Sequence, residues 1–92
     1  MKTTEVARAI QRLIRMRFPT VTVLPHERAG GTTGVFLALG IPDAEIADFA
    51  RFMMDRFNRE CEELGVNATV LPYCETDTRA YFPEYSSLPK RF

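Results

Sequence analysis

The stretch from residue 43 to residue 64 reads DAEIADFARFMMDRFNRECEEL, and it decides the fold. Asp43 is a candidate N-cap, and Glu45 and Asp48 place negative charge near the positive end of a helix dipole. Gly65 follows as the residue expected just after a helix end. We therefore predict one long helix over residues 43–64, with a length of about 33 Å at about 1.5 Å per residue.

This helix has one apolar side and one charged side. The apolar side, which we expect to face the core, consists of Ile46, Phe49, Ala50, Met53, Phe57, Cys61 and Leu64. The other side carries opposite charges at i,i+4 spacing, such as Arg51 and Asp55, which is typical of an exposed helix face. Phe52 interrupts this charged side, about 120° from the centre of the apolar stripe. We expect either that the C-terminal tail covers Phe52 or that Phe52 is an exposed apolar anchor for a partner.

Shorter elements surround the long helix. They are a helix over residues 4–17 and strands over residues 20–24, 32–39 and 66–71. Pro19 ends the first helix, and Pro72 ends the third strand. The first two strands form a hairpin, and because a helix connects the second strand to the third, a right-handed parallel crossover within one sheet is favoured for those two. The sequence leaves open whether the third strand neighbours the first or the second.

The element order α-β-β-α-β predicts one α+β domain over residues 1–92, with two helices packed on one face of a small mixed sheet. KH-like and BolA-like domains share this order, and Gly31-Thr32-Thr33-Gly34 resembles the GxxG loop of KH domains. In those domains the loop joins two helices, whereas here hairpin residues precede the string and strand sequence follows it. The similarity therefore carries no function.

The tail over residues 72–92 is rich in aromatic residues. It holds half of the aromatic residues of the chain, namely Tyr73, Tyr81, Phe82, Tyr85 and Phe92. Since disordered segments are poor in aromatic residues, we expect an ordered but irregular tail, with a short edge strand over residues 78–82. The tail packs on its own domain or docks onto another chain. Tyr81, Phe82, Tyr85 and Phe92 are therefore candidate partner-binding residues, as is Phe52.

Arginines mark a second candidate surface, on the first helix. Arg8, Arg12 and Arg15 fall within about 60° of one another, opposite the apolar stripe, and Arg17 adds to the local charge. Guanidinium groups gathered on one face bind carboxylates or phosphates in forked geometry. The alternative is a solvated face whose charge is partly neutralised by acids elsewhere in the fold.

Composition narrows the classes of function. The 92 residues hold 12 Lys+Arg and 12 Asp+Glu, so the chain lacks the basic field of a dedicated, sequence-indifferent nucleic-acid binder. The charge is nevertheless divided, because residues 1–40 carry 6 basic and 2 acidic side chains and residues 41–92 carry 6 and 10. Such a dipole orients a partner or a second copy of the chain, or else the two halves neutralise each other within the fold, which is the simpler assumption. No apolar run approaches the roughly 20 residues that cross a bilayer, and we expect a cytoplasmic protein with reduced thiols and no membrane partner.

The sequence contains few residues and no motif that would indicate catalysis or metal binding. His26 is the only histidine, and Cys61 and Cys74 belong to no short metal-binding spacing. The phosphate-binding string Gly-Lys-Ser/Thr is absent from the sequence. We therefore predict no catalytic residue, no metal and no cofactor, and an enzyme acting on a small molecule is the weakest hypothesis.

These observations favour a non-enzymatic macromolecular interaction domain, a small adaptor, regulator or inhibitor that acts by surface contact with another protein or protein complex. Small inhibitors encoded by bacteriophages are often built in this way. The rival hypothesis is RNA or DNA binding, in which the arginines of the first helix grip phosphates. Association of two copies of the chain is compatible with either.

Overall fold

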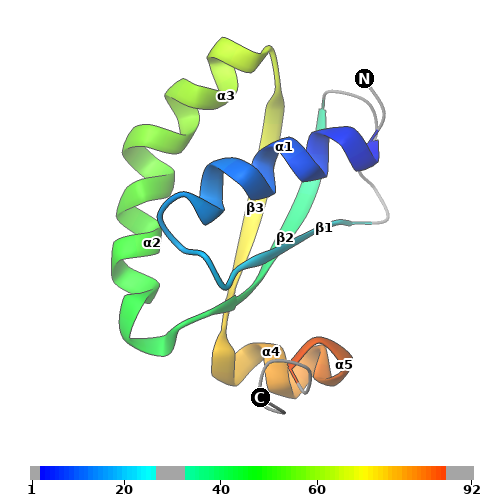
Figure 1. Ribbon diagram of the computed structural model, residues 1–92, viewed down its shortest axis with the longest axis vertical. Helices are drawn as coiled ribbons and strands as arrows, with labels where there is room; N and C mark the ends of the chain where they lie inside the picture. The colour runs from blue at the N-terminus through cyan, green and yellow to red at the C-terminus, as the bar shows by residue number, and fades with distance from the viewer. Residues whose placement is uncertain (1–2, 27–32, 87–92) are drawn as a thin grey trace.

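A mixed three-stranded sheet in the order β1-β2-β3 is the framework of the fold (Figure 1). The computed structural model describes residues 3–26 and 33–86. The strands are β1 (Thr22–Pro25), β2 (Thr33–Ile41) and β3 (Asn67–Cys74). β1 pairs antiparallel with β2, and β3 pairs parallel with the other side of β2. The predicted hairpin and the predicted parallel direction of the third strand are confirmed, and β3 neighbours β2, a choice that the sequence left open.

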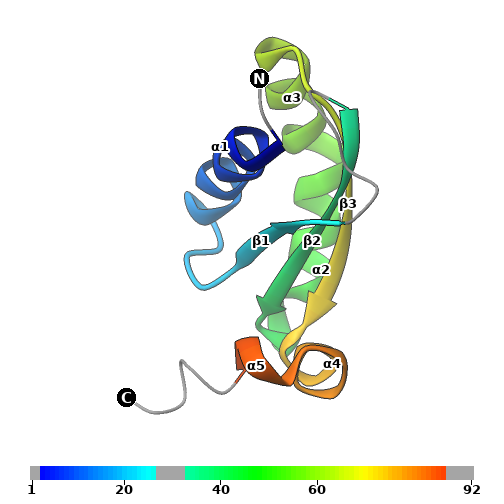
Figure 2. The same ribbon diagram turned by 90° about the vertical axis from the view of Figure 1, so that its right-hand side faces the viewer.

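Helices cover one face of this sheet. The first is α1 (Thr3–Arg15). The second is a continuous helical rod, residues 43–64, made of η1 (Asp43–Glu45), α2 (Ile46–Phe52), η2 (Met53–Phe57) and α3 (Asn58–Leu64). Gly65 ends the rod in the left-handed conformation, with φ 70°. Figure 2 shows the rod behind the sheet and α1 beside β1, with the opposite face of the sheet turned to the viewer. The predicted α+β class, with two helices packed on one face of a small mixed sheet, is confirmed.

The hydrophobic core lies between the helices and the sheet. It contains Val6, Ala7, Ile10, Ile14, Phe18, Val21, Val23, Phe36, Ala38, Ile41, Phe49, Phe52, Phe57, Cys61 and Val66. Side chains alternate along a strand, so Val35, Leu37 and Leu39 of β2 point to the opposite face. Leu39 is nevertheless buried, because the C-terminal helices pack against that end of β2.

The rod contains a π-helical turn at Met53–Phe57, which the helical pattern of the sequence did not predict. A π-turn bonds residue i to residue i+5 and so inserts one residue into the helical repeat. Phe52 and Phe57 consequently come into line, with ring centroids 6.2 Å apart. The prediction that Phe52 projects among charges is wrong, since it is only 8% exposed. Of the predicted apolar stripe, Ile46, Ala50 and Leu64 are exposed instead.

The C-terminal tail is helical rather than irregular over its described part. It forms α4 (Glu75–Tyr81) and α5 (Pro83–Ser86), which pack against β2, so the predicted edge strand over residues 78–82 is wrong. β3 also continues through Pro72 to Cys74, because an edge strand tolerates a proline whose nitrogen faces outward. Phe92 and the first residues of the GxxG string, Gly31 and Thr32, lie outside the described residues.

Candidate interaction surface

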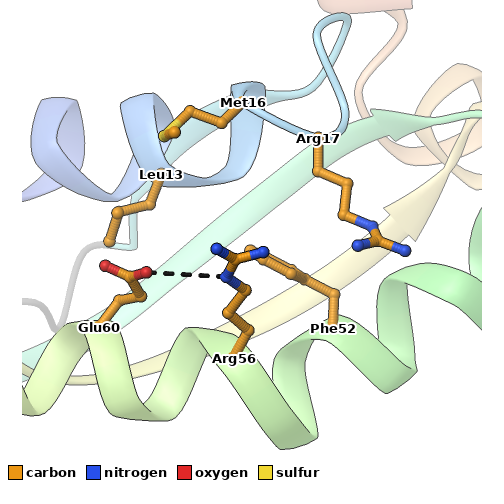
Figure 3. A pocket seen from close by; sticks show the side chains of 6 residues that line it. All are labelled: Leu13, Met16, Arg17, Phe52, Arg56 and Glu60. Atoms are coloured by element: carbon orange, nitrogen blue, oxygen red, sulfur yellow. Dashed lines mark ion pairs between the residues drawn. The ribbon is translucent and has the colours of Figure 1, made fainter.

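A groove runs between the end of α1 and the middle of the rod (Figure 3). Six residues line it: Leu13, Met16, Arg17, Phe52, Arg56 and Glu60. The groove measures about 180 Å³, below the roughly 300–1,000 Å³ of pockets that hold small molecules. Its size suits one or two side chains of a partner rather than a cofactor.

The turn after α1 creates this groove. Phe18 inserts its ring between the rod and α1, at 5.1 Å from the ring of Phe49 and 5.7 Å from that of Phe52. The backbone N–H of Phe18 also donates to the carbonyl of Ile14 at 2.8 Å, which closes the helix end tightly. Met16 is left outside the core and is 85% exposed, the most exposed large apolar side chain among the described residues. An apolar side chain so exposed beside an apolar floor is typical of a contact site.

The rim of the groove is charged. Arg56 pairs with Glu60 across one turn of the rod, with Nε and Oε1 3.8 Å apart. Arg17 reaches toward the rod from the loop after α1 (Figure 3), and its guanidinium group makes no hydrogen bond or ion pair with residues 3–26 or 33–86. Its guanidinium group is thus available to a carboxylate from outside.

The groove continues along the rod into a second hollow of about 260 Å³. This hollow shares Arg17, Phe52 and Arg56 with the first and adds Asp48, Arg51, Asp55 and Arg59. A third depression, of about 420 Å³, is lined by Arg56, Arg59, Glu60 and Glu63. All four of those residues lie on the rod, so that depression has a single wall and encloses nothing.

The four arginines predicted as one surface divide into two groups. Arg8 and Arg12 are exposed on α1. Arg15 is exposed as well, but its Nε donates a hydrogen bond to the carbonyl oxygen of Val21 at 2.8 Å and so ties α1 to the segment before β1. Arg17 lies past the end of α1 and belongs to the groove. The groove therefore joins two predicted residues, Arg17 and Phe52, that the sequence pattern assigned to separate surfaces.

Two of the predicted partner-binding residues of the tail, Tyr81 and Phe82, pack on their own domain. Their rings lie 6.4 and 5.1 Å from that of Tyr73 in β3, both in edge-on geometry. Tyr81 is still 69% exposed, and Tyr85 is exposed too. Tyr81 and Phe82 thus belong to a surface cluster that is separate from the groove.

Polar contacts also hold the tail in position. Thr78 is buried, and its hydroxyl accepts a hydrogen bond from the N–H of Gly40 at 2.8 Å. Gly40 has φ 76° and lies in the irregular part of β2, where the register with β3 shifts. The Thr78 hydroxyl thus satisfies a backbone donor that the sheet leaves without a strand partner.

Asp43 caps a different helix from the one predicted. Its carboxylate accepts hydrogen bonds from the Thr76 hydroxyl at 2.6 Å and from the Thr76 N–H at 3.1 Å, at the start of α4. A second contact links the same two segments, since Oε1 of Glu75 accepts a hydrogen bond from the Asp43 N–H at 3.4 Å. The Thr76 hydroxyl and then its N–H hold the pKa of Asp43 below the ordinary value. The starts of the rod and of α4 are therefore locked together.

Both cysteines are free thiols. Burial raises the pKa of the Cys61 thiol to about 11, with a further contribution from the Glu60 carboxylate. A hydrogen bond from the backbone N–H of Asp77 lowers the pKa of Cys74, but desolvation and the carboxylates of Asp43 and Asp77 outweigh it, so that pKa is raised. Neither thiol has the lowered pKa of a nucleophile.

The described part of the chain holds no cluster of three metal-ligating side chains. No helix in that part combines the length and the apolar character that crossing a membrane requires.

Sequence reasoning missed the groove because no single segment carries it. Leu13 and Met16 come from the end of α1 and the turn after it, whereas Arg56 and Glu60 come from the rod. One signal was present: Met16 and Arg17 directly precede Phe18-Pro19, so a large apolar side chain falls at a helix end where no helical neighbour covers it.

No protein-family model, no curated protein and no solved structure matches this chain. A proposal for its function therefore rests on its own residues.

Proposed function

We propose that the chain is a non-enzymatic interaction domain, a small adaptor, regulator or inhibitor, that binds another protein through the groove between α1 and the rod. The observation that carries the proposal is Met16, 85% exposed at the edge of a groove whose floor is the buried ring of Phe52. The occupant is an amphipathic segment of a partner, with an apolar side chain flanked by carboxylates.

The chemistry of the groove supports such an occupant. Contact sites place an apolar anchor in a small pocket and surround it with polar groups that exclude water. Leu13, Met16 and Phe52 supply the apolar part, and the flexible thioether of Met16 adapts to the shape of the anchor. Arg17 supplies, for a carboxylate beside the anchor, a guanidinium group that pairs with no side chain in the described part of the chain.

A matched pair of variants tests the proposal. The doubly changed protein Met16→Ser/Arg17→Glu removes the apolar edge and inverts the charge of the groove, whereas Leu64→Ser changes another exposed apolar residue that lines none of the three hollows. Each protein is used for affinity capture from the source cell after nuclease treatment, and the captured proteins are identified. We expect one captured partner to be lost with Met16→Ser/Arg17→Glu and retained with Leu64→Ser.

Capture that is equal for both variants contradicts the groove as the contact site. Capture that disappears for every protein after nuclease treatment favours nucleic-acid binding instead. Circular dichroism of both variants checks that the fold persists, which we expect because the changed side chains are exposed.

Nucleic-acid binding is the second candidate, and the exposure of Arg8 and Arg12 along α1 favours it. Phosphate contacts make log K fall with log[salt], with a slope of about −0.9 per phosphate neutralised on DNA. Replacing Arg8, Arg12 and Arg15 together by alanine should therefore flatten the slope by about 2.7. A fluorescence anisotropy titration with single- and double-stranded oligonucleotides measures this slope, and the absence of binding at low salt rules the candidate out.

A further inference from the structure

β3 presents a long open edge. It spans Asn67–Cys74, and among the described residues only β2 pairs with it. Unpaired edge strands are ordinarily protected by charged side chains, by proline or by shortness. The other edge strand, β1, has four residues and ends at Pro25, whereas β3 reads NATVLPYC and contains no charged residue. Only Pro72 protects it, near one end.

The surfaces on both sides of this edge are apolar and uncharged. On the rod, Ile46, Ala50 and Met54 follow one another at i,i+4 spacing on the side away from α1, and Met54 is 76% exposed and Ile46 38% exposed. On the uncovered face of the sheet, Leu71 is 39% exposed and Thr69 is exposed beside it. An open strand edge with exposed apolar side chains beside it on both faces is an interface rather than a solvated surface.

Pro72 restricts how another strand can pair with this edge. A proline in an edge strand places its nitrogen outward. Backbone groups two residues apart in a strand point to the same side. Ala68 and Val70 therefore also direct their N–H and C=O groups outward. An antiparallel strand can form hydrogen bonds with Ala68 and Val70 and end before it reaches Pro72. Such a strand does not need the N–H group that proline lacks.

We infer that two copies of the chain associate about a twofold axis by antiparallel pairing of their β3 edges, centred on Thr69. In this register Ala68 of one copy exchanges hydrogen bonds with Val70 of the other, and Pro72 falls opposite residue 66, before β3 begins. The two sheets become one continuous sheet, and Ile46, Met54 and Leu71 are covered from both copies.

Charge argues for a second copy as the occupant. A twofold interface sets each residue near its own counterpart, so a charged strip would repel itself, whereas this strip is neutral throughout. The formal net charge of the chain is zero as well, which removes long-range repulsion between copies. The groove of α1 and the rod lies on the other side of the rod and stays open in each copy, so the dimer would present two grooves.

Complementary charges at Thr69 test the register. At the twofold axis the two Thr69 Cα atoms would lie about 4.5 Å apart, so Thr69→Lys or Thr69→Glu alone sets like charges against each other. Sedimentation velocity from about 10 μM to about 1 mM should show wild-type dimers, and either variant alone should weaken association at least about tenfold. An equimolar mixture of the two variants should recover the dimer. Thr4→Lys, on exposed α1, is the matched control and should leave association unchanged.

Amide hydrogen exchange of the unaltered chain gives a second readout that needs no substitution. Exchange at Ala68 and Val70 should slow as concentration rises, whereas exchange at the amides of α4 should not change. A wild-type chain that stays monomeric to about 1 mM overturns the proposal. So does a dimer that Thr69→Lys leaves intact, a mixture that fails to recover association, or concentration-independent exchange at Ala68 and Val70.

Discussion

Two aromatic clusters hold this small domain together in different ways. The inner cluster joins Phe18, Phe49, Phe52 and Phe57, all buried, with ring centroids 5.1 to 6.4 Å apart. The outer cluster joins Tyr73, Tyr81 and Phe82 at similar distances, 5.1 to 6.4 Å, yet its rings remain partly in solvent. Similar ring geometry therefore accompanies very different burial.

The difference shows where stability comes from in each place. The inner rings are removed from water and contribute through the hydrophobic effect, whereas the outer rings lie on a tail that hydrogen bonds to Gly40 and Asp43 hold in position. An abundance of aromatic residues in a segment thus indicates order, and it does not by itself indicate a binding site.

The largest effect should come from the inner cluster. Phe52→Ala removes a buried ring that touches Phe18 and Phe57, and we expect a loss of about 3–5 kcal/mol in the free energy of unfolding. Urea denaturation followed by circular dichroism measures this loss. A loss below about 1 kcal/mol would show that the cluster repacks without the ring and would contradict its central place in the core.

The anchor of the outer cluster should have the next largest effect. Thr78→Val keeps the shape of the side chain but leaves the Gly40 N–H without its acceptor, at a cost of about 1–3 kcal/mol. Thr78→Ser keeps the hydroxyl and should cost less. Chemical denaturation of the two variants gives the comparison, and equal losses would assign the role of Thr78 to packing instead.

The contribution of the tail to stability should depend on pH, which distinguishes it from the contribution of the inner cluster. The folded pKa of Asp43 lies below its ordinary value of 3.8, so its contribution to stability is complete above that value and is lost as pH falls through the lower folded pKa. The melting temperature of Asp43→Asn should lie below that of wild type at pH 6. The two melting temperatures should converge as pH falls below about 3.8. A constant difference down to pH 2 would exclude the carboxylate as the cause.

The smallest effect should come from the exposed ring of the outer cluster. Tyr81→Ala removes a ring that is 69% exposed, and we expect a change within about 0.5 kcal/mol in urea denaturation. A loss comparable to that of Phe52→Ala would remove the distinction between the clusters.

The sequence pattern predicts the architecture because apolar residues recur along the chain at the spacing of buried helix and strand positions. The rod begins at Asp43 and ends before Gly65 as expected, and the helical crossover favours the parallel direction of β2 and β3, although it does not decide that they are neighbours. The π-turn has no comparable signal, since one inserted residue leaves the composition unchanged while it brings Phe57 into line with Phe52. Asp43 looks like a cap for the helix that follows it, and its actual partner, Thr76, lies 33 residues away.

The candidate site was less accessible to sequence reasoning for the same reason. Arg17 and Phe52 were chosen on separate grounds, and only the contact between α1 and the rod brings them to one groove. The outward β3 edge was hidden as well, because Pro72 reads as the end of a strand in sequence but lies inside one in the fold.

The π-turn also determines how the rod responds to a change in chain length. Each residue of an α-helix advances the helix by about 100°, so deleting one residue within Met53–Phe57 converts this turn to an α-turn and rotates the following half of the rod by that angle. Phe57 and Cys61 would then swing away from the sheet while Phe49 and Phe52 stayed in place. The middle of the rod therefore tolerates substitution at its exposed positions far better than it tolerates the loss of a single residue.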